Sequence, residues 1–213
     1  MKITALKAQL KNPNRVNVFV DGKYRFSLDA LQILELGIKT GAEFEEEALH
    51  AIETEGLFSK VYARSLEYAL VRPRSVKEMR DYLYRKTRPV RTKTGELRDG
   101  VPAEITTRVL ERLLEKNHIN DERFAQFWVE NRNVRKGSSM KKLRAELQAK
   151  GVASTIIDAA LSASERTDED ELQKIYEKRK HRYTDEQKLI AYLARQGFSY
   201  DAIRSVIAND QQY

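Results

Sequence analysis

Alternating hydrophobic and polar residues mark the start of the chain as a small β-sheet. Apolar residues alternate with other residues from Val16 to Val20, and the same alternation returns from Tyr24 to Leu28. The intervening Asp21-Gly22 predicts a two-residue hairpin turn, because both turn residues must accept a positive φ. Residues 3–10 are expected to add a third strand, which ends before a turn at Asn12-Pro13-Asn14.

Short helices are expected to complete an N-terminal module over residues 1–55. So small a sheet needs something to pack on, and Leu31, Leu34 and Ile38 provide the apolar positions of a short helix that ends at Gly37. Residues 43–55 are rich in glutamate and contain no lysine or arginine. Such a run is typical of a solvated helix face.

From residue 56 onward the hydrophobic spacing is helical, and the pattern occurs three times. Three middle helices, starting near residues 76, 140 and 186, share apolar positions at i+3 and i+7. The apolar positions of residues 152–161 return at 198–207, and each unit also has a leading helix. We therefore predict a mainly α-helical protein with three tandem three-helix repeats, over residues 56–117, 118–164 and 165–213. Because one such unit buries little surface alone, the repeats should stack in an elongated, curved array.

The starts of the middle helices repeat in their polar residues as well. RPRSVKEMRDYL at 72–83 aligns without a gap with KGSSMKKLRAEL at 136–147, so that serine, lysine, arginine and leucine coincide. Ser75 with Glu78, and Thr184 with Gln187, fit the capping box, in which side chains satisfy unpaired amides. The first repeat carries a basic insert at 87–101, which we expect to project as a loop.

Composition favours a polyanionic partner. Lysine and arginine number 39 against 32 aspartates and glutamates, which gives a formal net charge of +7 and favours nucleic acid or an acidic protein surface. The absence of cysteine excludes disulfides, thiolate zinc sites and cysteine nucleophiles. The sequence has neither the apolar core of a signal peptide nor the roughly 18 apolar residues of a membrane span. We expect a cytoplasmic monomer with no membrane partner.

Candidate catalytic residues are few. His50, His118 and His181 are scattered without metal-ligand spacing, and no G-x-x-x-x-G-K-S/T loop is present for nucleotide phosphates. The acids at 121–122 and 168–171 could in principle bind a metal, but at helix starts they more simply complement the helix dipole. We therefore predict a protein that is not an enzyme and that needs no cofactor or metal.

Cations form the candidate binding surface. Lys77, Arg80 and Tyr84 lie one residue along from the apolar stripe, and the same register recurs at Lys141 and Arg144. Any single cation is more simply a solubilising charge, whereas the repeated register favours a phosphate-facing surface. A weaker cluster extends from Lys174 to Arg182. The predicted surface comprises Arg72, Arg74, Lys77, Arg80, Arg85, Lys86, Arg88, Arg132, Arg135, Lys136, Lys141, Lys142, Arg144 and Lys150.

Three segments resemble the RecX family of recombinase regulators. They are RPRSVKEMRDYLYRK at 72–86, INDERFAQFWVENR at 119–132 and KGSSMKKLRAELQAKGV at 136–152. The family patterns are an R-P-R-S-like helix start, (L/I)-(D/N)-D-x-R-F-A, and G-x-x-x-(I/L)-x-x-E-L-x-x-K-G-(I/V). The resemblance covers roughly residues 57–208. The N-terminal strands look like the extension that some members carry.

The resemblance implies a regulator of the RecA recombinase. Such proteins lodge in the groove of the RecA–DNA filament and usually inhibit its ATP hydrolysis and strand exchange, in recombination, DNA repair and the SOS response. They also bind single- and double-stranded DNA without sequence preference. The third repeat departs from the first two, with Gln187, Ile190 and Gln196 at the cationic positions. We therefore expect the binding face on the first and second repeats.

Two other functions remain open on the sequence alone. Three-helix units with basic faces also occur in helix-turn-helix transcriptional regulators, which read a defined operator. An enzyme acting on nucleic acid would need a divalent metal, for which Asp121 and Glu122 are the candidate ligands.

Overall fold

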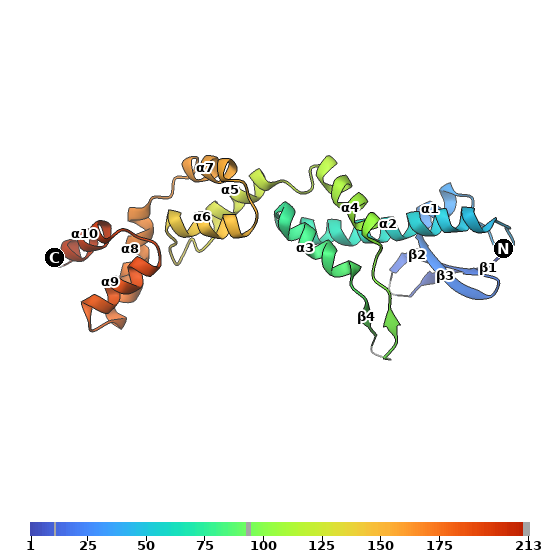
Figure 1. Cartoon of the computed structure of the whole chain (residues 1–213), viewed down its shortest axis with the longest axis horizontal. Coiled ribbons are helices and arrows are strands. Elements are labelled where there is room, and N and C mark those ends of the chain that lie inside the picture. Colours follow the sequence, from blue (N-terminus) through green and yellow to red (C-terminus); the bar gives the residue numbers. More distant parts are fainter. Residues whose placement is uncertain (11, 93–94, 211–213) are drawn as a thin grey trace. The chain divides into compact units, whose positions relative to one another are not determined.

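The protein is described by a computed structural model that covers residues 1–10, 12–92 and 95–210. Contacts between residues divide the chain into two compact units (Figure 1). The first unit comprises Met1–Arg72 and Met79–Ile119, and the second comprises Pro73–Glu78 and Asn120–Tyr213. The prediction of a mainly helical chain with a small N-terminal sheet is confirmed. Lys93 and Thr94 of the insert, and the last three residues of the third repeat, lie outside the described residues.

The N-terminal strands form one antiparallel sheet in the order β1-β2-β3. The predicted hairpin turn is confirmed, since Asp21 and Gly22 both have positive φ, of 48° and 80°. The predicted turn at Asn12-Pro13-Asn14 is wrong, because these residues begin β2 and Asn12 already pairs with Gln9. The strands are β1 (Ile3–Gln9), β2 (Asn12–Val20) and β3 (Lys23–Asp29).

Two helices, α1 (Ala30–Glu35) and α2 (Glu46–Leu70), accompany the sheet. The expectation that Leu31 and Leu34 pack on the sheet is wrong, because they are 64% and 76% exposed. Gln32 accepts a hydrogen bond from its helix start and donates to Ser59 of α2. This contact fixes the rotation of α1, so that Ile33 packs against the core instead.

Helix α2 is shared between the sheet and the first repeat (Figure 1). It runs without a break through the expected boundary at residues 55–56, and Gly56 is buried in its middle. A Cβ at Gly56 would lie 2.5 Å from Cδ2 of Leu28, so β3 packs closely on the helix here. Buried Arg15 strengthens this contact, because its Nη2 donates to the carbonyls of Ser27 at 2.7 Å and of Gly56 at 3.4 Å.

The first repeat is completed by α3 (Val76–Thr87) and α4 (Ala103–Glu115). Helix α4 packs on α2 through its buried residues Ile105, Val109 and Leu113. The insert is an antiparallel two-stranded ribbon, β4 (Val90–Arg91) and β5 (Leu97–Arg98), which extends away from α3 and α4 in Figure 1. The expected loop thus has a paired structure.

The second unit contains two three-helix groups, each with its own core. One core includes Phe124, Leu147 and Ile157, and the other includes Leu172, Leu193 and Ile203. The helices are α5 (Asp121–Asn131), α6 (Met140–Ala149), α7 (Ser154–Ser162), α8 (Asp168–Arg179), the 3-10 helix η1 (Lys180–Arg182), α9 (Glu186–Arg195) and α10 (Tyr200–Asp210).

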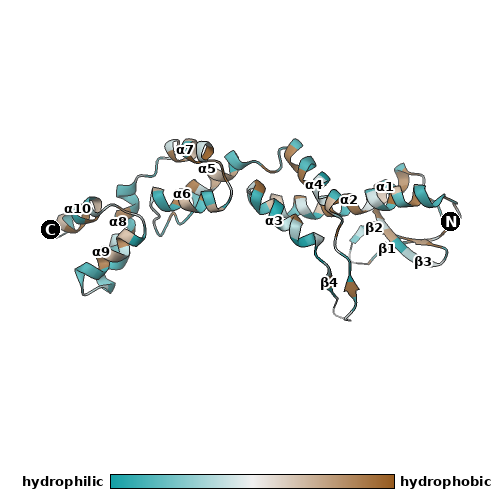
Figure 2. Cartoon of the chain, viewed as in Figure 1, coloured by the Kyte–Doolittle hydropathy of each residue, from teal (hydrophilic) through white to brown (hydrophobic). Residues whose placement is uncertain are grey.

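The apolar stripes of the middle helices are buried as predicted, at Leu143 with Leu147 and at Leu189 with Leu193. The predicted cap by Thr184 is wrong, because Asp185 is the residue that accepts from an amide of α9. Hydrophilic and hydrophobic segments alternate along the helices (Figure 2). In the ranges that the structure describes, none of the helices has the length and apolarity needed to cross a bilayer.

Candidate functional site

The serine that starts each of the first two middle helices contacts the following repeat, within the second unit. Ser75 Oγ accepts from the amide three residues later at 3.1 Å, as the capping box predicts, and donates to the carbonyl of Lys150 at 2.9 Å. Ser139 Oγ accepts in the same way at 3.1 Å and donates to the carbonyl of Gln196 at 2.6 Å. One hydroxyl therefore caps its own helix and also binds the end of the next middle helix. We call this arrangement the serine junction.

An aspartate completes each serine junction. The amide of Val76 donates to Oδ1 of Asp121 at 2.9 Å, and the amide of Met140 donates to Oδ1 of Asp168 at 2.7 Å. Two of the acids that were candidate metal ligands, Asp121 and Asp168, thus bind amides of the preceding middle helix. Within residues 1–10, 12–92 and 95–210, no group of three or more His, Asp or Glu side chains could hold a metal ion.

The repeated lysine of the middle helix also belongs to this junction. Lys77 Nζ donates to the carbonyl of Ala149 at 3.2 Å, and a Cβ at Gly151 would lie 2.9 Å from Cβ of Lys77. In the next junction, a Cβ at Gly197 would lie 3.4 Å from Cβ of Lys141. The aliphatic part of each lysine therefore covers a glycine of the following repeat, so packing accounts for part of the repeated register.

Ser139→Ala is expected to lower the free energy of unfolding by about 1–2 kcal/mol, because it removes a helix cap and a hydrogen bond to the next repeat. Chemical denaturation followed by circular dichroism measures the loss. Ser162→Ala, at an exposed position near the end of α7, is the control and should change stability by less than about 0.5 kcal/mol. Equal stability of the two variants would contradict the junction.

Arg132, Lys150 and Arg144 of the predicted surface are held in ion pairs. Arg132 binds Glu146 with two hydrogen bonds, Nε to Oε2 at 2.8 Å and Nη2 to Oε1 at 3.1 Å. Lys150 Nζ lies 2.7 Å from Oε1 of Glu78, and Arg144 pairs with Asp158. These side chains hold helices of the second unit together, which limits their freedom to contact a partner.

Glu146 has several hydrogen-bond partners. Burial opposes its ionisation, but hydrogen bonds from Arg132 and from Nε1 of Trp128, the latter 3.0 Å long, outweigh burial and hold the pKa of Glu146 below its ordinary value. The same carboxylate raises the pKa of Arg132. Arg132 and Lys150 also lie over the Trp128 ring, 5.1 and 5.4 Å from its centre.

The cations of α3 in the first unit are more accessible. Arg80 and Arg85 are exposed and have no ion pair within the described residues. Lys86 lies over the ring of Tyr82 at 4.8 Å, and Arg88 lies over the ring of Tyr84 at 4.9 Å. Arg72 and Arg74, just before the helix, are half-buried and interact with other groups of the chain.

A second accessible group lies around the start of α6. Arg135, Lys136 and Lys141 are exposed, and none of them forms an ion pair in the part of the chain that the structure describes. Lys142 is half-buried and donates to Oε1 of Gln196 at 2.7 Å. These cations of the second unit are available to an anion.

The third repeat contributes cations that the predicted surface left out. Lys178, Arg179 and Arg182 line the same hollow as Lys136 and Lys142. The sequence showed these cations as the weaker cluster between Lys174 and Arg182. It did not show which other cations would lie beside them in the fold.

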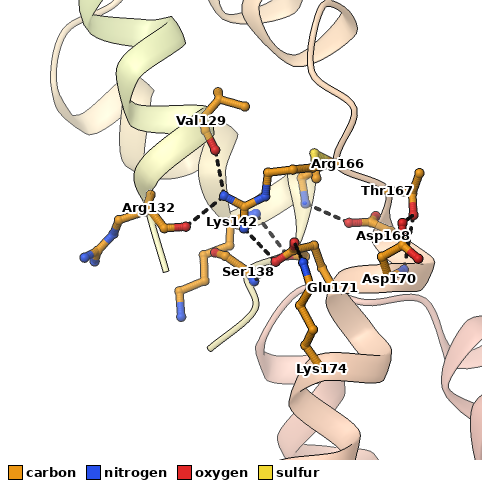
Figure 3. A network of polar contacts seen from close by, with 12 residues as sticks. Val129, Arg132, Ser138, Lys142, Arg166, Thr167, Asp168, Asp170, Glu171 and Lys174 are labelled. Atoms are coloured by element: carbon orange, nitrogen blue, oxygen red, sulfur yellow. Dashed lines mark hydrogen bonds and ion pairs between the residues drawn. The ribbon is translucent and has the colours of Figure 1, made fainter. Parts of the chain in front are cut away.

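A buried ion network fixes the loop before α6 to α8 (Figure 3). The side chain of Glu171 is 1% exposed and accepts from Nη2 of Arg166 at 2.6 Å, from Nζ of Lys174 at 2.8 Å and from the amide of Ser138 at 2.8 Å. Burial opposes ionisation of this carboxyl, but these hydrogen bonds outweigh it and lower the pKa of Glu171. The network thereby positions the residues next to Ser138, including Lys136.

Three family models match the chain. A model described as the RecX regulatory protein N-terminal domain matches residues 1–45. Models of the second and third three-helix domains of RecX match residues 120–161 and 167–207.

Relatives named regulatory protein RecX match nearly the whole chain. A protein of Bacillus pumilus is 31% identical over 210 residues, which cover 94% of this chain and 74% of the relative. A protein of Bacillus subtilis (strain 168) is 32% identical over 212 residues, which cover 96% of this chain and 75% of the relative. A protein of Clostridium perfringens (strain 13) is 30% identical over 215 residues, which cover 97% and 94%.

Solved structures share the fold. A crystal structure of regulatory protein RecX matches with a TM-score of 0.66 and 24% identity, covering 97% of this chain and 98% of that one. The crystal structure of RecX from Lactobacillus salivarius matches with a TM-score of 0.56 and 22% identity, covering 74% and 98%.

Proposed function

Because the chain belongs to the RecX family of regulatory proteins, we propose that it binds the RecA recombinase filament and inhibits its ATP hydrolysis and strand exchange. It does so by binding and without catalysis, in the bacterial cytoplasm and as a monomer. Through this inhibition it regulates recombination, DNA repair and the SOS response.

The observation that carries the DNA-binding part of this function is the set of cations without carboxylate partners. Arg80 and Arg85 in the first unit, and Arg135, Lys136 and Lys141 in the second, are exposed and form no ion pair within the described residues. Cations of this kind bind the phosphate backbone, release its counterions and confer strong salt dependence. They read no bases, which supports binding to single- and double-stranded DNA without sequence preference.

The paired cations are given a different role. Arg132, Arg144 and Lys150 belong to the predicted surface, but each already has a carboxylate partner. We assign them to holding the second unit in shape, so that the accessible cations stay in place. Loss of a paired cation should therefore reduce stability, whereas loss of an accessible cation should reduce binding.

The proposed function is tested by measuring RecA's DNA-dependent ATPase and strand exchange with the purified protein. The wild type is expected to inhibit both at stoichiometric amounts. The triple variant Arg135→Glu, Lys136→Glu, Lys141→Glu should need at least about tenfold more protein for the same inhibition, because the loss of even one charge-assisted contact of about 1.5 kcal/mol corresponds to about a factor of ten.

A matched control has the same change in net charge. The control is the triple variant Lys188→Glu, Arg195→Glu, Arg204→Glu, whose positions are exposed on α9 and α10. It should inhibit RecA as strongly as the wild type does. A wild-type protein that leaves both RecA activities unchanged would refute the proposed function. Protection of one defined duplex sequence in footprinting would instead favour a transcriptional regulator.

A further inference from the structure

A basic hollow lies between the second and third repeats, within the second unit. Its volume is about 380 Å³, and its lining includes Lys136 and Lys142 from around the start of α6. Lys178 and Arg179 from α8, together with Arg182 from η1, complete the set. Among the described residues no carboxylate lines this hollow, which we call the seam pocket.

The charge of the seam pocket is not neutralised from within the chain. In the part that the structure describes, its five cations form no ion pair, because the nearby acids of α8 have other partners. Glu171 binds Arg166 and Lys174, and Glu177 binds Lys180. Several uncompensated positive charges around one concave surface raise the local concentration of anions.

Packing holds two of these cations in place. Arg179 lies over the ring of Tyr192, 5.3 Å from its centre, and Lys142 donates to Oε1 of Gln196 at 2.7 Å. Lys136, Lys178 and Arg182 are exposed around them. A guanidinium and an ammonium that are already oriented lose little freedom when an anion arrives.

We infer that the seam pocket binds phosphodiester groups of the DNA backbone. The inference rests on the proposed DNA binding and extends it to the third repeat, whereas the sequence placed the expected binding face on the first and second repeats. Arginine and lysine are the side chains that bind phosphate oxygens most strongly. A DNA backbone carries several phosphates in succession. This suits a pocket that is lined by cations from three segments of the chain.

The test compares two neutralised variants of the full chain. Lys178→Gln with Arg182→Gln alters the seam pocket at exposed positions. Arg195→Gln with Arg204→Gln removes the same charge from exposed positions of the same repeat, outside the pocket. Binding of a fluorescent oligo-dT is measured by anisotropy over a range of salt concentrations, and circular dichroism verifies that both variants fold.

The pocket variant is expected to bind oligo-dT about tenfold more weakly than the wild type, while the control changes little. Its plot of log affinity against log salt should be shallower by about 1.4, since each neutralised phosphate on a single strand contributes about 0.7. Equal affinities and slopes for both variants overturn the inference but leave the proposed function intact. A wild type that binds no oligo-dT overturns both the inference and the proposed DNA binding.

Two further measurements identify the source of the anion. If the pocket variant loses affinity for ATP or inorganic phosphate but keeps oligo-dT binding, the pocket takes a free phosphate compound and the inference is overturned. If the pocket variant keeps oligo-dT binding but inhibits RecA less well, the ligand is an acidic protein surface. This result also overturns the inference. Competition of oligo-dT by excess double-stranded DNA in the wild type, weaker in the pocket variant, supports the backbone as the ligand.

Discussion

Glu171→Leu is expected to lower the free energy of unfolding by about 3–5 kcal/mol, because it leaves the charge of Arg166 buried without its partner. The change also removes the acceptor of the Ser138 amide, so the loop before α6 loses its attachment to α8. Chemical denaturation gives the stability. Hydrogen exchange at the Ser138 amide, which should become much faster, gives the local effect.

Glu169→Leu is the control for this change. Glu169 is exposed in the first turn of the same helix, where an acid contributes only the favourable dipole interaction of about 0.3–1 kcal/mol. Comparable destabilisation by the two substitutions would show that burial of the ion network is unimportant. Arg166→Met in the Glu171→Leu background should recover part of the loss, since it removes the unpaired charge. Recovery stays partial because Arg166 also donates to the carbonyls of Val129 and Arg132.

The contribution of Glu171 also depends on pH. Its pKa is lower in the folded chain than in the unfolded chain, where the pKa of glutamate is about 4.3. The stabilisation is therefore complete above about pH 5 and is lost as the pH falls through the folded pKa. The stability difference between the wild type and Glu171→Leu should be constant from neutral pH to about pH 5 and shrink in more acidic solution.

Gly137→Ala is expected to cost about 3 kcal/mol of unfolding free energy. Gly137 has a φ of +83°, a left-handed conformation that costs other residues about 1–2 kcal/mol. A Cβ at this position would also lie 2.6 Å from the carbonyl oxygen of Glu171 and 2.6 Å from Cγ1 of Ile175. The loop before α6 would have to move away from α8, because a backbone oxygen cannot yield as a flexible side chain can.

Gly41→Ala separates backbone strain from close packing as causes of the destabilisation. Gly41 has a φ of +93°, and an added Cβ there would meet nothing within 4 Å, so this variant carries the backbone strain alone. It should cost about 1–2 kcal/mol. If both alanine variants are destabilised equally in chemical denaturation, close packing at Gly137 contributes nothing. Gly137→Ala should also weaken oligo-dT binding, since Lys136 and the seam pocket depend on the same loop.

Much of the fold follows from local sequence patterns. The Asp21-Gly22 turn needs only two residues of permissive conformation, and the buried leucines of the middle helices follow from helical spacing. The local signal fails at α1, where Leu31 and Leu34 have the right spacing for a buried face. Gln32 instead turns the helix through its contact with Ser59, 27 residues away, which no local pattern records.

The candidate site is less predictable, because a cation's availability depends on distant carboxylates. Lys150 is a cation and so suits anion binding, but it is paired with Glu78, which lies 72 residues earlier in the chain. Conversely, Lys178 and Arg182 gain importance from Lys136 and Lys142 across the seam between repeats. Glu171 looks like an ordinary acid of a first helical turn until Ser138 and Arg166 are placed around it. Composition identified the charges, and tertiary contacts decide their roles.

The serine junction also bears on how the chain is made. Ser75 binds the carbonyl of Lys150, and Ser139 binds that of Gln196, so each of the first two middle helices obtains a hydrogen-bond partner from the repeat translated after it. On the ribosome, a finished repeat would therefore keep an incompletely bonded helix start until the next repeat emerges. Each helix start is therefore protected from solvent in the order in which the repeats are translated. The most recently made repeat is the one that a chaperone or protease can still reach.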